Sequence, residues 1–203
     1  MRNYLYILMI VLFTAFTASA QEFRYGVLGG TNAYDIEVDG PLIASSGISK
    51  LNLGVFGDYQ IDDRFGVKMN VIYTSTTEGD YGVLSGATLY PMFEEAKLTT
   101  LQFHPMAKFD VNSDYNKGFH LLAGFRVTNI LSAEIDNVNA SGFYKTTNFG
   151  ALAGFGVTIV RTVTFEILAD YSLGSHLSSP GSSSKNVGAY GNFLIDISSL
   201  IKK

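Results

Sequence analysis

Eight stretches of the chain alternate apolar and polar residues, and this alternation constrains the fold more than any other feature. In VTFEILADYSL, residues 163–173, the odd positions are apolar and the even positions are polar, with Leu168 as the one exception. A period of two places successive side chains on opposite faces of a β-strand. The eight predicted strands are 23–33, 51–61, 65–74, 99–111, 118–130, 147–159, 163–173 and 187–197.

The length and spacing of these strands indicate a membrane barrel. Most are about 10 to 13 residues long, close to what a tilted strand needs to cross a bilayer. Short connections at 62–64, 112–117 and 160–162 alternate with long ones near 34–50, 75–98, 131–146 and 174–186. Such alternation is typical of up-and-down outer-membrane barrels. The sequence therefore predicts an all-β, eight-stranded antiparallel transmembrane β-barrel, localised to the bacterial outer membrane.

The N-terminal segment has the pattern of a cleaved signal peptide. Arg2 precedes an apolar run over 4–16, and the small residues Ala18 and Ala20 follow in the spacing of a cleavage site. The apolar run is shorter than the roughly 20 residues that a membrane helix needs. We therefore expect residues 1–20 to be removed and residues 21–203 to form one outer-membrane barrel domain.

Periodicity alone leaves open which face of the strands points inward. A soluble, lipocalin-like binder of a small apolar ligand would turn the apolar face inward, whereas a membrane barrel turns it toward lipid. Two observations favour lipid: glycines share the polar face, which suits a narrow lumen, and aromatic residues gather near the strand ends, as in interfacial girdles. The girdle residues that we expect are Phe65, Phe119 and Phe165 toward the short turns and Tyr73 and Tyr171 toward the long loops.

The polar face predicts ion pairs that fill the lumen. The ionisable residues expected there are Asp58, Lys68, Lys108, Arg126, Glu166 and Asp170. Counting back from the short turn at 62–64 sets Asp58 opposite Lys68, so we expect a buried ion pair between them. Arg126 is expected to cross the lumen toward Glu166 or Asp170. Because eight strands leave no room for a water channel, we interpret these residues as a structural plug rather than an ion path.

The composition and the histidine positions argue against several other functions. The net charge of −4 and the lack of a basic cluster predict no nucleic-acid partner. The chain has no cysteine, which excludes disulfides and thiol chemistry. His104 and His120 are out of register on adjacent strands, so we expect no metal site and no cofactor. The barrel is expected to be a monomer.

Three stretches resemble a known family. YGVLGGTNAY, TLQFHPMAKFDV and FGALAGFGVTI are similar to the PorT-like group of outer-membrane β-barrel domains, small barrels of the OmpA and OmpX type. The resemblance implies an eight-stranded outer-membrane barrel without catalytic residues. It also implies a link to protein secretion, which some relatives assist. The chain departs from the pattern by ending SSLIKK, where such barrels often finish on an aromatic residue.

Two functional hypotheses follow for the long loops. Loops on a rigid barrel are free to vary, so 75–98 and 131–146 are the predicted contacts for a protein partner. Alternatively, His176 and Ser178 beside Asp170 resemble the lipid A deacylase pattern, which would make the protein a lipid-modifying esterase. Against that, SHLSSPGSSSK has the composition of a solvated loop of turn-forming residues. We therefore expect a non-enzymatic barrel.

Overall fold

The structure is a computed structural model that describes residues 22–39, 42–43, 46–85, 88–112, 115–135, 137–178 and 183–201. The predicted signal peptide, residues 1–20, lies outside the described residues. The elements in chain order are β1 (Phe23–Asp39), β2 (Leu42–Ile43), β3 (Ser46–Gln60), β4 (Phe65–Ser85), β5 (Thr88–Asp110), β6 (Gly118–Ile135), β7 (Val138–Asn139), the 3₁₀ helix η1 (Ser141–Phe143), β8 (Thr147–Val160), β9 (Val163–Ser172), β10 (Ser183–Asp196) and α2 (Ser198–Ile201).

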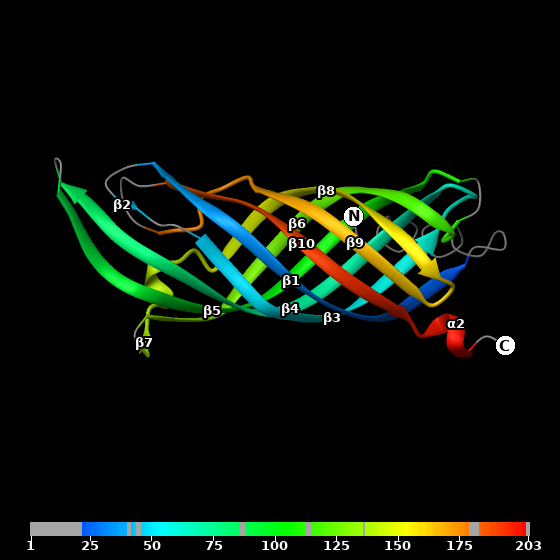
Figure 1. Ribbon diagram of the computed structural model, residues 1–203, viewed down its shortest axis with the longest axis horizontal. Helices are drawn as coiled ribbons and strands as arrows, with labels where there is room; N and C mark the ends of the chain where they lie inside the picture. The colour runs from blue at the N-terminus through cyan, green and yellow to red at the C-terminus, as the bar shows by residue number, and fades with distance from the viewer. Residues whose placement is uncertain are drawn as a thin grey trace, which may run out of the picture.

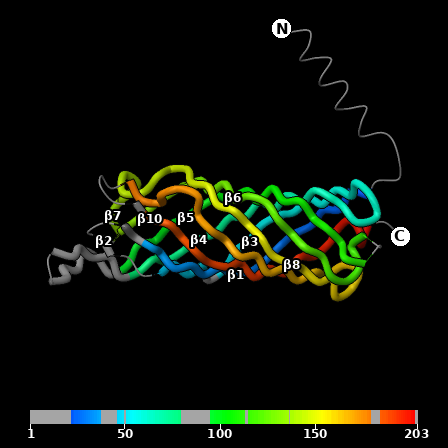
Figure 2. Tube along the Cα trace, turned by 90° about the horizontal axis from the view of Figure 1, so that it is seen from above, coloured from blue at the N-terminus to red at the C-terminus, as the bar shows by residue number. Residues whose placement is uncertain are grey.

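The eight long strands close into an antiparallel ring (Figure 1, Figure 2). Pairing runs β4–β3–β1–β10–β9–β8–β6–β5, and β5 pairs back to β4. The short strands β2 and β7 add to β4 and β6 outside the ring. Closure satisfies the backbone polar groups of every strand within the wall, which is the condition for β-strands to span lipid. The predicted eight-stranded antiparallel barrel is confirmed. None of the helices in the described ranges is long and apolar enough to cross a membrane.

At the long-loop end the strands run further than the alternation predicted. β4 continues to Ser85 and β5 starts at Thr88, so most of the predicted loop 75–98 is a paired hairpin. β10 likewise starts at Ser183 rather than at residue 187. Backbone pairing continues here, but residues 74–80 and 183–186 are polar on both faces and residues 89–93 are apolar on both, so the period-two contrast fades. The predicted ends on this side were therefore wrong for β1, β3, β4, β5, β6 and β10, whereas β8 starts at Thr147 as predicted and β9 ends within one residue of the prediction.

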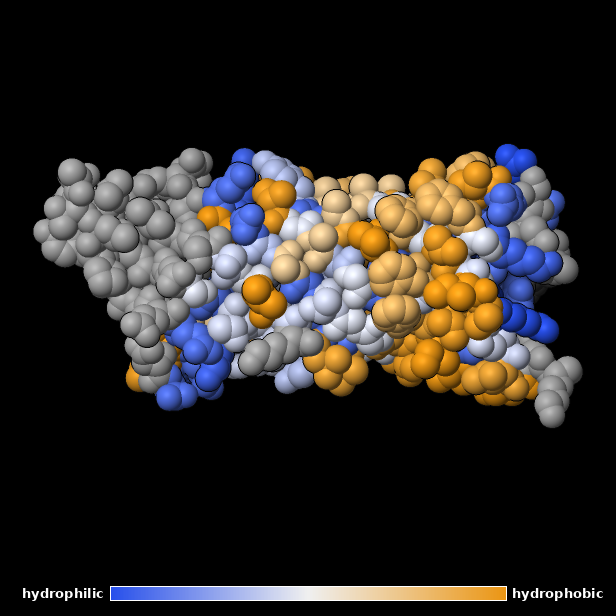
Figure 3. All heavy atoms as spheres, viewed as in Figure 1, coloured by the Kyte–Doolittle hydropathy of each residue, from blue (hydrophilic) through white to orange (hydrophobic). Residues whose placement is uncertain are grey.

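The apolar face of the barrel points outward. Val67 is 50% exposed, whereas its neighbour Lys68 is 2% exposed. Figure 3 shows apolar side chains gathered as a broad band across the visible face of the barrel, in the half nearer the short turns. The hydrophobic odd register is therefore the lipid-facing surface, as predicted. The alternative of a soluble binder with an apolar lumen required the opposite orientation and is wrong.

Several apolar residues stand in the otherwise polar register, and two of them, Ile72 and Leu168, lie in the interior with 0% exposure. They belong to two apolar clusters, one with Leu28, Phe56 and Leu194 and the other with Met106, Leu122, Leu152 and Tyr190. On β9, Leu168 lies between the inward-facing Glu166 and Asp170. The interior is therefore layered, with apolar side chains between two polar regions, rather than polar throughout.

Glycine on the inner face allows adjacent strands to bend closely past one another. A Cβ atom on Gly124 would overlap the carbonyl oxygen of Pro105 on the neighbouring strand, and one on Gly154 would overlap that of Ile167. Glycine in a strand interior often marks such a close backbone approach. The glycines of the polar register therefore reflect the tight curvature of a small barrel.

Candidate functional site

The interior near the short turns holds a polar cluster around Asp58. Lys108 Nζ donates a hydrogen bond to Asp58 Oδ2 at 2.9 Å and a second one to Asn116 Oδ1. The hydroxyl of Tyr115 donates to the other oxygen of Asp58, and the Lys108 ammonium lies 4.3 Å from the centre of the Tyr115 ring. Burial and the adjacent carboxylate raise the pKa of Tyr115 well above its ordinary value. The phenol therefore stays protonated and remains a hydrogen-bond donor.

Beside this cluster, Lys68 and His120 converge on Glu166. Lys68 Nζ forms an ion pair with Glu166 Oε1, and His120 Nε2 lies 3.4 Å from the same oxygen. A Cβ atom on Gly156 would overlap the His120 ring, so the glycine makes room for this pair. Lys68 comes from β4 and Glu166 from β9, which stand opposite each other in the ring. The contact therefore spans the lumen.

The structure does not form the predicted Asp58–Lys68 ion pair. The two residues are register partners on β3 and β4, as the turn count predicted. However, Asp58 pairs with Lys108, and Lys68 pairs with Glu166. Across so narrow a barrel, a long lysine side chain reaches the opposite wall as readily as the adjacent strand. The register prediction was right, and the pairing inferred from it was wrong.

A second polar cluster lies on the other side of the apolar layer, around Arg126. Its Nε atom donates to Asp170 Oδ1 at 3.0 Å, and Asp170 Oδ2 is also 3.0 Å away. The remaining guanidinium nitrogens donate to Thr128 Oγ1 at 2.6 Å, Asn148 Oδ1 at 2.6 Å and Ser172 Oγ at 3.0 Å. A Cβ on Gly150 would come within 2.6 Å of Asp170 Oδ1. Of the two acids considered for Arg126, the structure joins it to Asp170.

Sequence reasoning missed an ion pair between the first and the last strand of the barrel. Arg24 at the start of β1 binds Asp196 at the end of β10, and its Nη2 donates to the carbonyl of Arg161 at 2.8 Å. Ser198 and Ser199 donate to the same carboxylate. The signal was available, because ring closure places the first strand beside the last.

Sequence reasoning also missed a carboxylate at the long-loop mouth, Glu78, which lay in a predicted loop. Tyr34 donates to Glu78 Oε1 at 2.6 Å, Tyr144 donates to Oε2 at 3.0 Å, and His176 Nε2 lies 3.0 Å from Oε1. Asn148 Nδ2 lies 3.2 Å from His176 Nδ1. These contacts tie the β6–β8 and β9–β10 connections to β1 and β4.

Apolar side chains cover this mouth. They form one cluster of Ile36, Ala96, Leu98, Ala133, Tyr144 and Leu177. Tyr144 and Leu177 also pair through their backbones, which joins the two connections directly. The long-loop end of the barrel is therefore closed by packed side chains.

The residues of the esterase hypothesis are not arranged as a nucleophile and its base. His176 is buried, and its two ring nitrogens contact Glu78 and Asn148. Ser178 is exposed, and its amide donates to the carbonyl of Phe143 at 2.9 Å. Among the described residues, no contact joins the Ser178 hydroxyl to the His176 ring. The arrangement fixes loop position rather than activating a hydroxyl.

Two cavities inside the described part of the barrel are small. One of about 10 Å³ lies among Lys68, Glu166 and their neighbours, and one of about 20 Å³ lies beside Arg126 and Tyr190. Each is at most about large enough for a single water molecule. A wider hollow of about 700 Å³ opens at the short-turn end, where Arg24 and Asn116 form part of its lining. Within the described residues, no group of three or more histidine and carboxylate side chains is placed to hold a metal ion.

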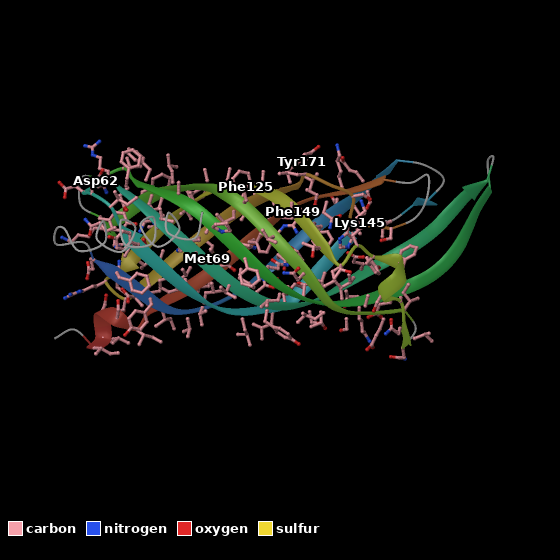
Figure 4. The ribbon with its side chains drawn as sticks, turned by 180° about the vertical axis from the view of Figure 1, so that it is seen from behind. Asp62, Met69, Phe125, Lys145, Phe149 and Tyr171 are labelled. Atoms are coloured by element: carbon pink, nitrogen blue, oxygen red, sulfur yellow. The ribbon has the colours of Figure 1, made fainter. Side chains whose placement is uncertain are left out.

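The predicted girdle residues lie on the outer surface at the two ends of the apolar band. Three of them pair with rings on neighbouring strands: Phe65 with Phe109 at 4.9 Å, Phe119 with Phe155 at 5.5 Å and Phe165 with Phe193 at 4.8 Å. Tyr73 and Tyr171 are 52% and 44% exposed. In Figure 4, Met69, Phe125 and Phe149 lie between Asp62 at the short-turn end and Lys145, beyond which the β4–β5 hairpin continues. That these rings mark the two membrane interfaces stays a prediction.

Comparisons with known proteins agree with this geometry. A family described as outer membrane protein beta-barrel domain matches residues 19–178. Ail, the attachment invasion locus protein of Yersinia pestis, is 12% identical with a TM-score of 0.50, over 87% of this chain and 99% of that chain.

Two further barrels give lower structural scores. OprG of Pseudomonas aeruginosa is 16% identical with a TM-score of 0.45, over 87% of this chain and 92% of that chain. The neisserial surface protein NspA is 16% identical with a TM-score of 0.49, over 86% and 98%. No curated protein sequence matches significantly. At such identities, the likeness to Ail shows the fold alone.

Proposed function

The chain belongs to the outer membrane protein beta-barrel domain family and is an integral protein of the bacterial outer membrane, and from this premise we propose that it is a filled, non-conducting platform that binds a protein partner outside the cell. The barrel acts as a monomer and needs no cofactor. Recognition lies in the hairpin 75–98 and the connection 131–146. The six lumen ionisable residues have a structural role, because they hold the platform rigid.

One observation carries this proposal: β4 and β5 stay paired far beyond the apolar band. Their pairing runs from Phe65↔Phe109 to Ser85↔Thr88, with one register shift between Tyr81 and Gly82. Above Tyr73, the next outward-facing positions of β4 are Ser75, Thr77 and Gly79, which carry no large apolar side chain. At about 3.3 Å per residue, the segment from Ser75 to Ser85 extends roughly 35 Å along the strand. In Figure 1 this hairpin reaches past the other labelled strands.

The other proposed contact segment is held firmly against the barrel. Tyr144 anchors the connection to Glu78, and Lys145 N donates to the carbonyl of His176 at 3.0 Å. A surface held in one shape loses little conformational entropy when it binds. This favours recognition over a purely structural role for the loops.

The filled interior argues against transport. The cavities of about 10 and 20 Å³ lie on either side of an apolar layer that contains Leu168. Ions do not cross such a layer without a hydrated path. We expect planar bilayers containing the purified protein to show no stepwise conductance, and steady conductance steps would contradict the proposal.

The hairpin can be shortened without removing Glu78. Glu78 and Ala96 are register partners, so an Asn-Gly turn joining them replaces residues 79–95 while keeping the Glu78 contacts. We expect this variant to fold, shown by different gel mobility when boiled and unboiled, and to lose cross-linking to its partner on intact cells. The matched control is Asp35→Asn, a change at an exposed position of β1 outside both proposed contact segments. Equal cross-linking by the truncated and full-length chains would refute the assignment.

The PorT-like resemblance supports a finer form of the proposal, in which the partner takes part in protein secretion. A strain lacking this chain should lose secreted proteins from its medium, and the full-length chain should restore them. The truncated chain should not restore them. Normal secretion in the deleted strain would remove the link to secretion but leave the platform role standing.

A further inference from the structure

The short C-terminal helix α2 exposes two large apolar side chains at the periplasmic end of the barrel. Leu200 is 58% exposed and Ile201 is 67% exposed. The neighbouring turn residues at this end are polar, including Asp62 and Arg64. Adjacent apolar side chains left bare on an ordered element are a common mark of an interaction surface.

This exposure is not that of a loose chain end, because α2 is fixed to the barrel. Asp196 Oδ1 accepts hydrogen bonds from Ser198 Oγ at 2.6 Å and from the Ser199 amide at 3.0 Å. The other oxygen of Asp196 binds Arg24 on β1. Leu200 N donates to the carbonyl of Ile197 at 3.0 Å. Leu200 and Ile201 are therefore held in place with their side chains uncovered.

The exposed pair adjoins the lipid-facing surface. Ile197 N donates to the carbonyl of Tyr25 at 3.0 Å, which places the start of α2 beside the outward-facing residues at the start of β1. Tyr25 is 44% exposed, Phe23 is 52% exposed, and their rings stack at 6.0 Å. Ile195, on the last outward position of β10, is 47% exposed. Figure 1 shows α2 beside the end of β10, at the end of the barrel that carries the short turns.

From this continuity we propose that α2 is a membrane anchor: Leu200 and Ile201 insert into the interfacial region of the periplasmic leaflet, next to Phe23 and Tyr25. The short turns of such barrels face the periplasm, so this leaflet is the phospholipid one. The sequence continues with Lys202 and Lys203. Cationic side chains that follow an apolar pair suit the anionic phosphates of a lipid interface.

The absence of cysteine from the sequence allows a direct test. A single Cys introduced as Ile201→Cys becomes the only thiol, and a nitroxide attached to it reports its surroundings. The protein is reconstituted into vesicles of phosphatidylethanolamine and phosphatidylglycerol. The measurement compares relaxation of the nitroxide by oxygen, which concentrates in lipid, with relaxation by a water-soluble nickel chelate.

Two matched positions calibrate the result. Val67→Cys lies within the apolar band, and Val138→Cys lies on β7 at the opposite end of the barrel, where Val138 is 69% exposed. We expect the label at 201 to resemble the one at 67, with high oxygen and low nickel accessibility. A label at 201 that matches the one at 138 would overturn the proposal, since no protein partner is present in the vesicles.

A second variant shows whether the apolar side chains cause the insertion. With the label kept at Ile201→Cys, the further change Leu200→Asn should raise nickel accessibility several-fold, while the heat-dependent gel shift shows that the barrel remains folded. Unchanged accessibility would mean that the strands alone set the depth of α2, and the anchor role would be rejected.

Discussion

Lys68 and Asp58 are direct neighbours across two adjacent strands, yet they do not pair with each other. Lys68 crosses the lumen to Glu166, and Asp58 accepts its hydrogen bond from Lys108 at 2.9 Å. Each ion pair therefore joins strands that are not adjacent in the ring. Backbone hydrogen bonds already hold neighbouring strands together, so these buried contacts add a constraint that the sheet itself does not provide.

Removing one partner of the cross-lumen pair should destabilise the barrel strongly. In Lys68→Met, the carboxylate of Glu166 stays buried without its cation, and we expect the free energy of unfolding to fall by about 3–5 kcal/mol. Adding Glu166→Gln should recover much of this loss. Urea titration in vesicles, read from the boiled and unboiled gel mobilities, measures both changes.

The control is a surface pair of the same chemistry. Lys97 and Glu95 lie 3.8 Å apart with both side chains more than half exposed. Lys97→Met should change the free energy of unfolding by about 1 kcal/mol or less. A Lys68→Met variant as stable as this control would show that the buried pair does not hold the barrel closed.

The contact between His120 and Glu166 needs a glycine at position 156. Gly156→Ala would push a methyl group into the His120 ring, and we expect a loss of about 1–3 kcal/mol in the free energy of unfolding. Gly191→Ala is the matched control, because a Cβ there meets nothing within 4 Å. If both variants unfold at the same urea concentration, the packing argument fails.

Glu78 should control the order of the long-loop mouth. Glu78→Gln keeps the size of the side chain but replaces one acceptor oxygen by a donor amide, which faces the hydroxyl or ring N–H groups of Tyr34, Tyr144 and His176. We expect the free energy of unfolding to fall by about 1–3 kcal/mol. Hydrogen exchange at the amides of Lys145 and Ser178 should accelerate, because these groups pair the two connections.

The matched control for the mouth is Glu134→Gln, a change at an exposed carboxylate on β6. It should leave the exchange of both amides unchanged. Equal exchange in the Glu78 variant and this control would show that the apolar cover, rather than the carboxylate, holds the connections.

The β3–β4 turn should carry a stabilisation that disappears in acid. Asp62 Oδ1 accepts hydrogen bonds from the amides of Arg64 and Phe65, both at 2.8 Å, and these bonds lower the pKa of Asp62. A carboxyl whose pKa is lowered in the folded state stabilises the protein above its unfolded-state pKa. This contribution is lost as the pH falls through the lowered, folded-state pKa.

We therefore expect Asp62→Ala to unfold more easily than the parent protein at neutral pH and to approach it in acid. Urea midpoints measured across this pH range test the sign. Asp63→Ala, at the next position of the same turn, removes neither of the two hydrogen bonds to Asp62 and is the matched control. A gap between the parent and Asp62→Ala that widens in acid would contradict the assignment.

The sequence by itself determined the number of strands, their antiparallel order and the face that meets lipid. The strands and their order follow from local rules, namely the period of two along a strand and the short turn that sets Asp58 opposite Lys68. The face that meets lipid follows from the glycines on the polar face and the aromatic residues near the strand ends. Even the exceptions carried information, since Ile72 and Leu168 mark the apolar layer inside the barrel. The polar pattern faded beyond Tyr73, however, so the hairpin was underestimated and Glu78 was overlooked.

Only the tertiary structure decided which charges meet across the lumen. Lys68 reaches Glu166 on the opposite wall, and Arg126 reaches Asp170 rather than Glu166. Distances between non-adjacent strands depend on how many strands close the ring and on how far they tilt and stagger. These are properties of the closed barrel as a whole, and no single strand's pattern contains them.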